Sequence, residues 1–182
     1  MPGIWITKET VLHSDCKIFK INRSRRQSET SGYEQDFFVL EGNNWVNIIP
    51  MTSDNKVIMV RQYRHGVEKE MLEIPGGAFN KGETAIEAGL RELREETGFT
   101  STETSLIGVS YPNPAIQSNE YNIVLALNCE KKFEQELDPA EEIEVEFIPI
   151  EKIPDLILRG EIKHSLVIVA FYYYDLYLKT KK

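Results

Sequence analysis

Short apolar runs separated by polar turns recur along the chain, a pattern that predicts β-strands over much of its length. The strongest runs, residues 45–50 and 56–60, flank Ser53-Asp54-Asn55, which predicts two strands joined by a turn. Two later runs, 122–127 and 144–149, have the same character. We therefore expect these four segments to be strands.

The N-terminal part of the chain has weaker β-like runs. Residues 17–21 and 35–40 lie on either side of the polar stretch 22–28, and together they predict a small antiparallel sheet. We place a soft boundary between this N-terminal β region, residues 1–43, and a main domain, residues 44–182.

Helical signals are confined to the main domain. The clearest helix begins at Thr84 or the residue after it and ends before Gly98, because Thr84 and Glu87 fit a capping box and glycine suits a left-handed C-terminal cap. Residues 153–158 and 165–178 predict two further helices. Strands mixed with a few helices in 182 residues favour an α/β sandwich.

Composition and charge limit the classes of function. With 41% hydrophobic residues the chain can bury a core, which excludes a disordered or fibrous protein. A formal charge of -8 disfavours a protein that neutralises many nucleic-acid phosphates. We therefore expect no nucleic-acid partner, although an acidic protein can still bind a phosphorylated small molecule through a metal ion.

Cysteine usage and the apolar runs bear on the compartment. Only Cys16 and Cys129 are present, which provides neither a disulfide framework nor a zinc-type cluster. The start of the chain lacks the pattern of a secretory signal, and the longest apolar run, residues 166–174, is about half of a membrane span. These features favour a cytoplasmic protein with no membrane partner.

Three glutamates share one turn of the helix that follows Thr84. Glu92, Glu95 and Glu96 are neighbours at spacings of three and four residues, where like charges destabilise a helix by a few tenths of a kcal/mol per pair. A hard divalent cation such as Mg²⁺ or Mn²⁺ offsets this repulsion. The alternative is a solvated face on which Arg91 pairs with Glu95.

Glycines around this helix favour a binding site over a solvated face. Gly76 and Gly77 precede the helix and suit a loop whose exposed carbonyl or amide reaches a ligand. Gly89 lies inside the helix, where glycine costs about 1 kcal/mol relative to alanine, which indicates a close backbone approach.

The segment as a whole resembles the Nudix box, the signature of Nudix hydrolases. Gly77, Glu83 and the run Arg91-Glu92-Leu93-Arg94-Glu95-Glu96-Thr97-Gly98-Phe99 match every fixed position of that signature. The resemblance implies a Nudix-type α/β/α sandwich with a mixed sheet. It further implies a strand-loop-helix element that holds Mg²⁺ or Mn²⁺ for hydrolysis of a nucleoside diphosphate linked to another moiety.

The resemblance also assigns roles within the box. Glu92 and Glu96 are implied to be the primary metal ligands, Glu95 a further ligand, and all three part of the catalytic site. The carbonyl of Gly76 is implied to be a backbone ligand. Two other box residues, Glu83 and Arg91, are expected to orient the loop and the helix.

Sequence outside the box resembles the branch that hydrolyses ADP-ribose and nucleotide-sugars. Residues 60–64 followed by 72–77 have the pattern of that branch, as do 141–143 and 160–163. Pro114 falls at about the spacing where the branch carries a proline beyond the box. The similarity therefore covers most of the chain.

Three residues are expected to bind or support the substrate. Arg64 can offer a guanidinium fork to a diphosphate or a terminal ribose, and its alternative is a surface arginine at a strand end. Glu73 can support the site from behind or be a plain strand carboxylate. Pro114 is assigned to the substrate site through the resemblance.

Hydrolysis needs a base for the attacking water, which related enzymes supply from a glutamate on a late loop. Residues 134–146 are rich in acids, and we expect Glu141 to be this base, with Glu142 next and Glu120 as a third candidate. A solvated acidic loop is the alternative interpretation.

Together these features predict a divalent-metal-dependent pyrophosphatase. Its expected substrate is ADP-ribose or another nucleoside diphosphate-sugar, cleaved to a nucleoside monophosphate and a sugar phosphate. The resemblance implies a homodimer formed through the N-terminal sheet. Three alternatives stay open: a Nudix hydrolase of nucleoside triphosphates or dinucleoside polyphosphates, a nucleotide-sensing Nudix domain without catalysis, and an acidic interaction domain without a ligand.

Overall fold

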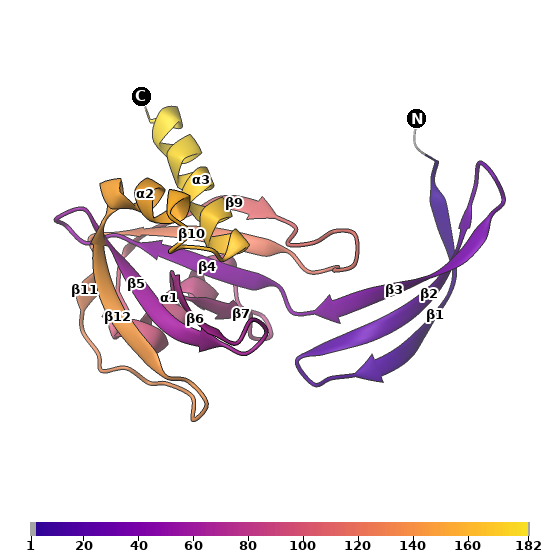
Figure 1. The fold of residues 1–182 in the computed structure, drawn as a ribbon, viewed down its shortest axis with the longest axis horizontal. Helices are drawn as coiled ribbons and strands as arrows, with labels where there is room; N and C mark the ends of the chain where they lie inside the picture. The colour runs from indigo at the N-terminus through magenta and orange to yellow at the C-terminus, as the bar shows by residue number, and fades with distance from the viewer. Residues whose placement is uncertain (1–2, 182) are drawn as a thin grey trace. The chain divides into compact units, whose positions relative to one another are not determined.

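The computed structural model describes residues 3–181. Contacts divide the chain into two compact units (Figure 1). The first unit contains the residues up to Asn44 together with Tyr111–Glu120, and the second contains Trp45–Ser110 with the residues from Tyr121 onward.

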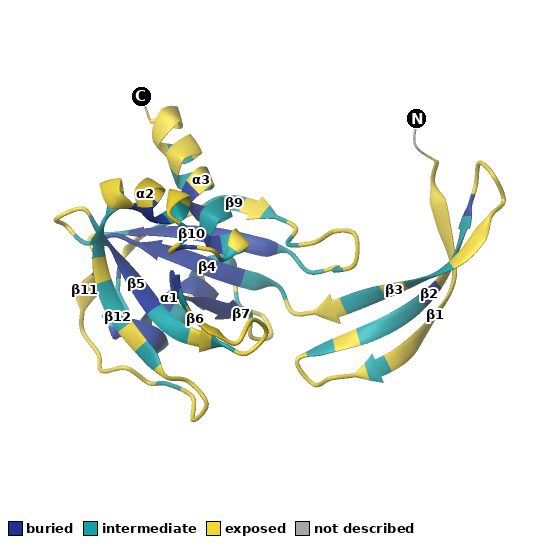
Figure 2. Cartoon of the chain, viewed as in Figure 1, coloured by how far each residue is buried: buried dark blue, intermediate teal, exposed yellow. Residues whose placement is uncertain are grey.

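The first unit is built on an antiparallel sheet of three strands. These are β1 (Trp5–Asp15), β2 (Phe19–Ser28) and β3 (Glu34–Gly42), hydrogen-bonded in the order β1-β2-β3. The antiparallel sheet predicted from sequence is therefore present, but its strands are longer than the apolar runs alone indicated. Most of its residues are exposed or only half-buried (Figure 2).

The polar stretch 22–28 lies inside β2. Its arginines pair across the sheet with acidic residues of β3, as Arg23 does with Asp36 at 3.1 Å and Arg25 does with Glu34 at 3.4 Å. Cross-strand pairs of opposite charge stabilise a sheet that has no fully buried face. The polar stretch therefore forms most of β2, where the apolar runs alone predicted only residues 17–21.

The second unit contains a mixed sheet, a second sheet and a short ribbon. Its strands are β4 (Trp45–Pro50), β5 (Lys56–Arg64), β6 (Lys69–Glu73), β7 (Gly76–Ala78), β8 (Phe99–Thr100), β9 (Glu103–Ser110), β10 (Tyr121–Leu127), β11 (Glu130–Lys131) and β12 (Ile143–Pro149). The first sheet has the order β7-β4-β10-β9, with β4 and β10 parallel and the other neighbours antiparallel. The second sheet has the order β12-β5-β6, and β8 pairs with β11. The four strands predicted for this domain are all present.

The predicted helices are present as well. They are α1 (Ala85–Thr97), α2 (Ile153–Leu158) and α3 (Ser165–Thr180), with a short 3₁₀ turn, η1 (Ile150–Lys152), before α2. Thr84 and Glu87 form the predicted capping box, and Gly98 closes α1 in the left-handed region with φ of 77°. Within residues 3–181, no helix has the length and apolar character needed to cross a membrane.

Helices cover both faces of the mixed sheet. Val46 and Ile48 of β4 pack with Leu93 of α1 in one apolar cluster. Ile49 of β4 packs with Phe171 of α3 in the other, because successive side chains of a strand point to opposite faces. Buried residues accordingly concentrate in the central strands β4 and β10 (Figure 2).

Gly89 lies on the side of α1 that packs against the sheet. A Cβ atom added to Gly89 would lie 3.5 Å from the side chains of Ile48 and Val124, which is ordinary van der Waals contact. The helix therefore lies close to β4 and β10 at this position, but an alanine would also fit, so the packing does not require a glycine here.

Candidate active site

The glycine strand β7 lies directly against helix α1. A Cβ atom built on Gly77 would collide with the carboxylate of Glu92, so only glycine permits this approach. A Cβ atom built on Gly76 would collide with the side chain of Asn47 and the carbonyl of Val46. The two glycines therefore place bare backbone between β4 and the Glu92 carboxylate.

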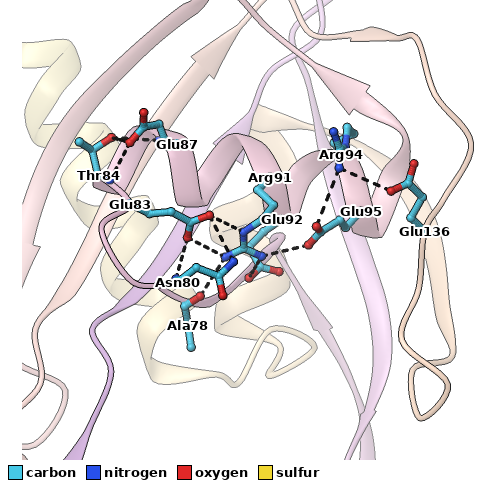
Figure 3. A network of polar contacts seen from close by, with 10 residues as sticks. All are labelled: Ala78, Asn80, Glu83, Thr84, Glu87, Arg91, Glu92, Arg94, Glu95 and Glu136. Atoms are coloured by element: carbon cyan, nitrogen blue, oxygen red, sulfur yellow. Dashed lines mark hydrogen bonds and ion pairs between the residues drawn. The ribbon is translucent and has the colours of Figure 1, made fainter.

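Arg91 links the loop before α1 to the acidic side of the helix (Figure 3). Its Nε and Nη2 atoms donate to the two carboxylate oxygens of Glu83 at 2.8 and 3.1 Å, and Nη2 also donates to the carbonyl of Ala78 at 2.9 Å. Its Nη1 donates to Glu92 at 2.8 Å and to Glu95 at 3.0 Å. One guanidinium group thus joins β7, the loop and the helix, which supports the orienting role expected for Arg91 and Glu83.

Hydrogen bonds hold Glu83 in its ionised form. The side-chain hydrogen bond from Arg91 is the main cause that lowers the pKa of Glu83 to about 2. The backbone N–H of Asn80 donates to the same carboxylate at 2.7 Å and lowers this pKa further. The Arg91–Glu83 ion pair therefore ties the loop between β7 and α1 to the helix.

The box glutamates do not form a solvated face. The Arg91–Glu95 pair of that alternative is present, and Glu95 is the most exposed of the three carboxylates. The side chain of Glu92, however, is only 14% exposed, and Glu96 is 4% exposed. Burying charge is unfavourable unless it is paired, so two acidic groups on the packed side of α1 call for compensation.

Glu96 has the least compensated charge at the site. Its Oε2 atom is buried and has no hydrogen-bond partner among the described residues. Burial raises the pKa of Glu96 well above its ordinary value, and the charges of Glu92 and Glu141 raise it further. Arg64 and a backbone hydrogen bond from Gly76 lower the same pKa without cancelling the effect of burial.

The pKa of Glu92 is also raised, but less than that of Glu96. Burial raises the pKa of Glu92, hydrogen bonding and charge from Arg91 lower it, and the charges of Glu95 and Glu141 raise it. The charge of Glu141 therefore acts on both the half-buried Glu92 and the buried Glu96. The fold brings this late-loop glutamate near the box, although 45 residues separate Glu96 from Glu141 in sequence.

Glu141 and Glu142 lie on the exposed loop that leads into β12. The backbone N–H of Asp138 donates to the Glu141 carboxylate at 3.0 Å, and the Glu141 N–H donates to the Asp138 carbonyl at 2.9 Å. Both glutamates line a cavity of about 530 Å³, together with Gln62 and Tyr63 of β5. Its volume is within the range of small-molecule binding sites.

Arg64 and Glu73 form a two-point ion pair. Nε and Nη2 of Arg64 donate to the two oxygens of Glu73 at 2.9 and 2.8 Å. Glu73 is only 1% exposed, and its hydrogen bond raises the pKa of Arg64. Glu73 thus supports the guanidinium group from the interior, as expected of a residue that backs the site, and Arg64 is not a free surface arginine.

Pro114 and Glu120 belong to the first unit. Both lie in Tyr111–Glu120, whereas the box and its supporting strands belong to the second unit. The expected part of Pro114 in substrate binding, and of Glu120 as a base, therefore stays a prediction.

Two polar side chains at the site were not singled out from the sequence. The Nε2 atom of Gln62 and the Nδ1 atom of His164 are buried without a hydrogen-bond partner in the described part of the chain. Burial lowers the pKa of His164, and the charges of Glu73 and Arg64 also act on it. No sequence spacing signals that His164 lies near the Arg64–Glu73 ion pair, because His164 follows Glu73 by some 90 residues.

The oxygen donors of the site suit a divalent cation. Among residues 3–181, no three His, Cys, Asp or Glu side chains are already gathered as a metal shell, and Arg91 engages both Glu92 and Glu95. The unpartnered oxygen of Glu96 and the raised pKa values of Glu92 and Glu96 show carboxylates that lack positive charge. Since Mg²⁺ and Mn²⁺ prefer carboxylate and carbonyl oxygens, the three glutamates and the carbonyl of Gly76 fit such an ion.

The Arg91–Glu83 pair gives a testable dependence of stability on pH. We expect Glu83→Gln to lower the free energy of unfolding by about 2 kcal/mol near neutral pH, the scale of hydrogen bonds to charged groups. Because the folded pKa of Glu83 is about 2 against an ordinary 4.5, this stabilisation is complete above about pH 4.5 and is lost as the pH falls toward 2.

Urea denaturation of wild type and variant, at neutral pH and near pH 3, measures this difference. Glu151→Gln, an exposed position in η1, is the control and should show no difference at either pH. A Glu83→Gln difference that does not shrink in acid would contradict the assignment.

Comparison with known proteins agrees with the geometry of the site. The NUDIX domain family matches residues 44–170. The chain is 33% identical over 132 residues to an ADP-ribose pyrophosphatase of Bacillus subtilis (strain 168), covering 72% of this chain and 71% of that protein. It is 30% identical, over the same shares, to a methanol dehydrogenase activator of Bacillus methanolicus.

A solved structure extends the likeness to nearly the whole chain. The crystal structure of an ADP compounds hydrolase matches with a TM-score of 0.85 at 21% identity, covering 97% of this chain and 95% of that one. This likeness confirms the predicted α/β/α sandwich. With the box residues, their geometry and the family match in agreement, the chain belongs to the Nudix family.

Proposed function

We propose that the protein is a divalent-cation-dependent pyrophosphatase that hydrolyses ADP-ribose or another nucleoside diphosphate-sugar. The observation that carries the proposal is the buried carboxylate of Glu96 beside the half-buried carboxylate of Glu92, next to the glycine strand and with too little positive charge to offset theirs. The resemblance to an ADP-ribose pyrophosphatase supports the substrate class.

Four groups of this chain are assigned to the cation. Glu92 and Glu96 are the primary ligands, and Glu95 and the carbonyl of Gly76 complete the set. Bound there, Mg²⁺ or Mn²⁺ supplies neutralisation of the diphosphate charge and a more acidic water.

Arg64 is assigned to the substrate. In the described part of the chain its hydrogen bonds use Nε and Nη2, both with Glu73, which leaves Nη1 available to an anionic group. Because Glu73 fixes the plane of the guanidinium, Arg64 can orient the diphosphate or the terminal ribose with little loss of side-chain freedom.

Glu141 is assigned as the base. It accepts a proton from the attacking water, whose oxygen bonds to one phosphorus as the bridging P–O bond breaks. The bridging oxygen leaves with the second phosphate, so the products are a nucleoside monophosphate and a sugar phosphate. The cavity beside Glu141 is the space that receives the substrate.

The first unit is assigned to assembly. Its three-stranded sheet exposes large apolar side chains, among them Ile6, Leu12 and Phe38. A two-fold partner would cover such a surface, so we propose a homodimer formed through β1–β3. The two cysteines, both free, suit a cytoplasmic setting.

A phosphate-release screen tests the activity. With Mg²⁺ or Mn²⁺ and a coupled phosphatase, we expect ADP-ribose or one nucleotide-sugar to be hydrolysed in preference to nucleoside triphosphates and dinucleoside polyphosphates. Glu92→Gln should lower kcat by about 100-fold. The bound cation stabilises the transition state by several kcal/mol, and this variant removes one of its carboxylate ligands.

Glu87→Gln is the matched control for this variant. It changes the same residue type on the same helix, and glutamine is also compatible with a capping box. Preference for triphosphates would refute the substrate class, and full activity of Glu92→Gln would refute the metal assignment.

A second pair of variants tests the base. Glu141→Gln should lower kcat by about 100-fold, the scale of general base catalysis, and lower Mn²⁺ affinity much less than Glu92→Gln does. Its neighbour Glu142→Gln should retain activity. If Glu142→Gln is the inactive variant, the base is Glu142, and if neither is impaired, the loop does not supply the base.

Sedimentation equilibrium tests the assembly. We expect a dimer for the wild type and a shift toward monomer for Phe38→Glu, because a two-fold interface receives the introduced charge twice. Leu158→Glu, on α2, places the same charge at an exposed apolar residue of the second unit and should leave the dimer intact. A monomeric wild type would rule out the proposed dimer.

A further inference from the structure

Asn47 is a polar residue where the strand pattern calls for an apolar one. It lies in β4 and is 2% exposed. Its strand neighbour two positions on, Ile49, faces the apolar cluster of α2 and α3, and its register partner on β10 is the buried Ile123. An amide buried among such side chains is unfavourable unless it makes hydrogen bonds. The Nδ2 atom of Asn47 makes them, whereas its Oδ1 atom has no hydrogen-bond partner among the described residues.

The amide of Asn47 holds the connection between β6 and β7. Its Nδ2 atom donates to the carbonyl of Ile74 at 3.1 Å and to the carbonyl of Pro75 at 3.2 Å. The N–H of Ile48 adds a third bond, to the Pro75 carbonyl at 2.9 Å. Both carbonyls of this two-residue connection thus accept hydrogen bonds from donors on β4.

Asn47 also lies directly against Gly76. Asn47 is the register partner of Gly76 in the β4–β7 pairing, and a Cβ atom on Gly76 would collide with the Asn47 amide nitrogen. Gly76 in turn gives a backbone hydrogen bond to Glu96. The amide thus lies against the same backbone unit whose carbonyl is assigned to the cation.

We propose that Asn47 is a positioning residue for the cation site: by fixing the carbonyls of Ile74 and Pro75, it sets the orientation of the Gly76 backbone beside Glu96. The inference rests on the proposed function, because that function assigns the Gly76 carbonyl to the cation. Asn47 itself touches neither cation nor substrate and acts through the peptide that follows Pro75.

A second buried asparagine provides a matched control. Asn122 lies on the adjacent strand β10, is 6% exposed and is the register partner of Val46. Its Nδ2 atom has no hydrogen-bond partner among the described residues, whereas that of Asn47 has two. Replacing either by leucine removes a buried amide of similar size from the same sheet, but only Asn47→Leu removes side-chain hydrogen bonds from the β6–β7 connection.

The test measures cation binding apart from turnover. Mn²⁺ is titrated into each purified full-length variant and followed by the loss of the free-ion electron paramagnetic resonance signal, with urea denaturation as the measure of folding. We expect Asn47→Leu to weaken Mn²⁺ binding about 10-fold or more, the usual effect of losing a residue that orients a ligand, and Asn122→Leu to leave it within about two-fold.

Two outcomes would overturn the positioning role. One is Mn²⁺ affinity of Asn47→Leu within two-fold of wild type, and the other is equal weakening in both leucine variants, which would make the effect a general one of the sheet. If Asn47→Leu does not give the wild-type circular dichroism spectrum, Asn47→Ser replaces it, because serine is too short to reach Pro75. Mn²⁺ affinity of Asn47→Ser within two-fold of wild type would then overturn the positioning role.

The same titration separates this inference from the proposed function. Wild type must bind Mn²⁺ and Glu92→Gln must lose most of that binding. If wild type does not bind the ion, the proposed cation site fails and the positioning role fails with it. If wild type binds and Glu92→Gln does not, then an unchanged Asn47→Leu overturns the positioning role alone.

Discussion

The burial of acidic charge on one turn of α1 is the constraint on which the rest of the second unit depends. Glu96 is buried and Glu92 is half-buried, so water stabilises their charge less than it would on an exposed helix face. Arg91 offsets the charge of Glu92, while Glu96 depends on Arg64 and the Gly76 amide, which are insufficient to keep its pKa near the ordinary value. A site that is short of positive charge before any ligand arrives is suited to a divalent cation and, through it, to a diphosphate.

The sandwich provides what this constraint requires. Helix α1 is pinned to β4 and β10 by an apolar cluster, so its acidic turn cannot move away from the sheet. The glycines of β7 let bare backbone lie beside Glu92, and the Asn47 amide holds the connection before them. A packed helix and strand thus carry the oxygen donors, whereas the candidate base Glu141 is on an exposed loop, where movement during a reaction cycle costs little.

The two units are stabilised by different interactions. The second has fully buried strands and helices on both faces of its mixed sheet, so it is stabilised mainly by apolar packing. The first is a three-stranded sheet with exposed faces, held by cross-strand ion pairs such as Arg23–Asp36. Such a sheet has little core of its own, which is the physical reason for expecting a second copy of the chain to cover it.

The sequence by itself determined the parts whose signals are local. Capping residues, glycine positions and strand periodicity fixed α1 and the main strands, and the spacing of the box fixed the carboxylates. The apolar runs did not show that β2 extends through residues 22–28, because the partners of these polar residues lie on β3 and a single segment does not contain them. Only the tertiary structure decided which glutamates lose contact with water, that Glu73 fixes Arg64, and that Asn47 and His164 lie beside the site. Burial and long-range contact are properties of the packed chain, and residues far apart in sequence carry no local signal of them.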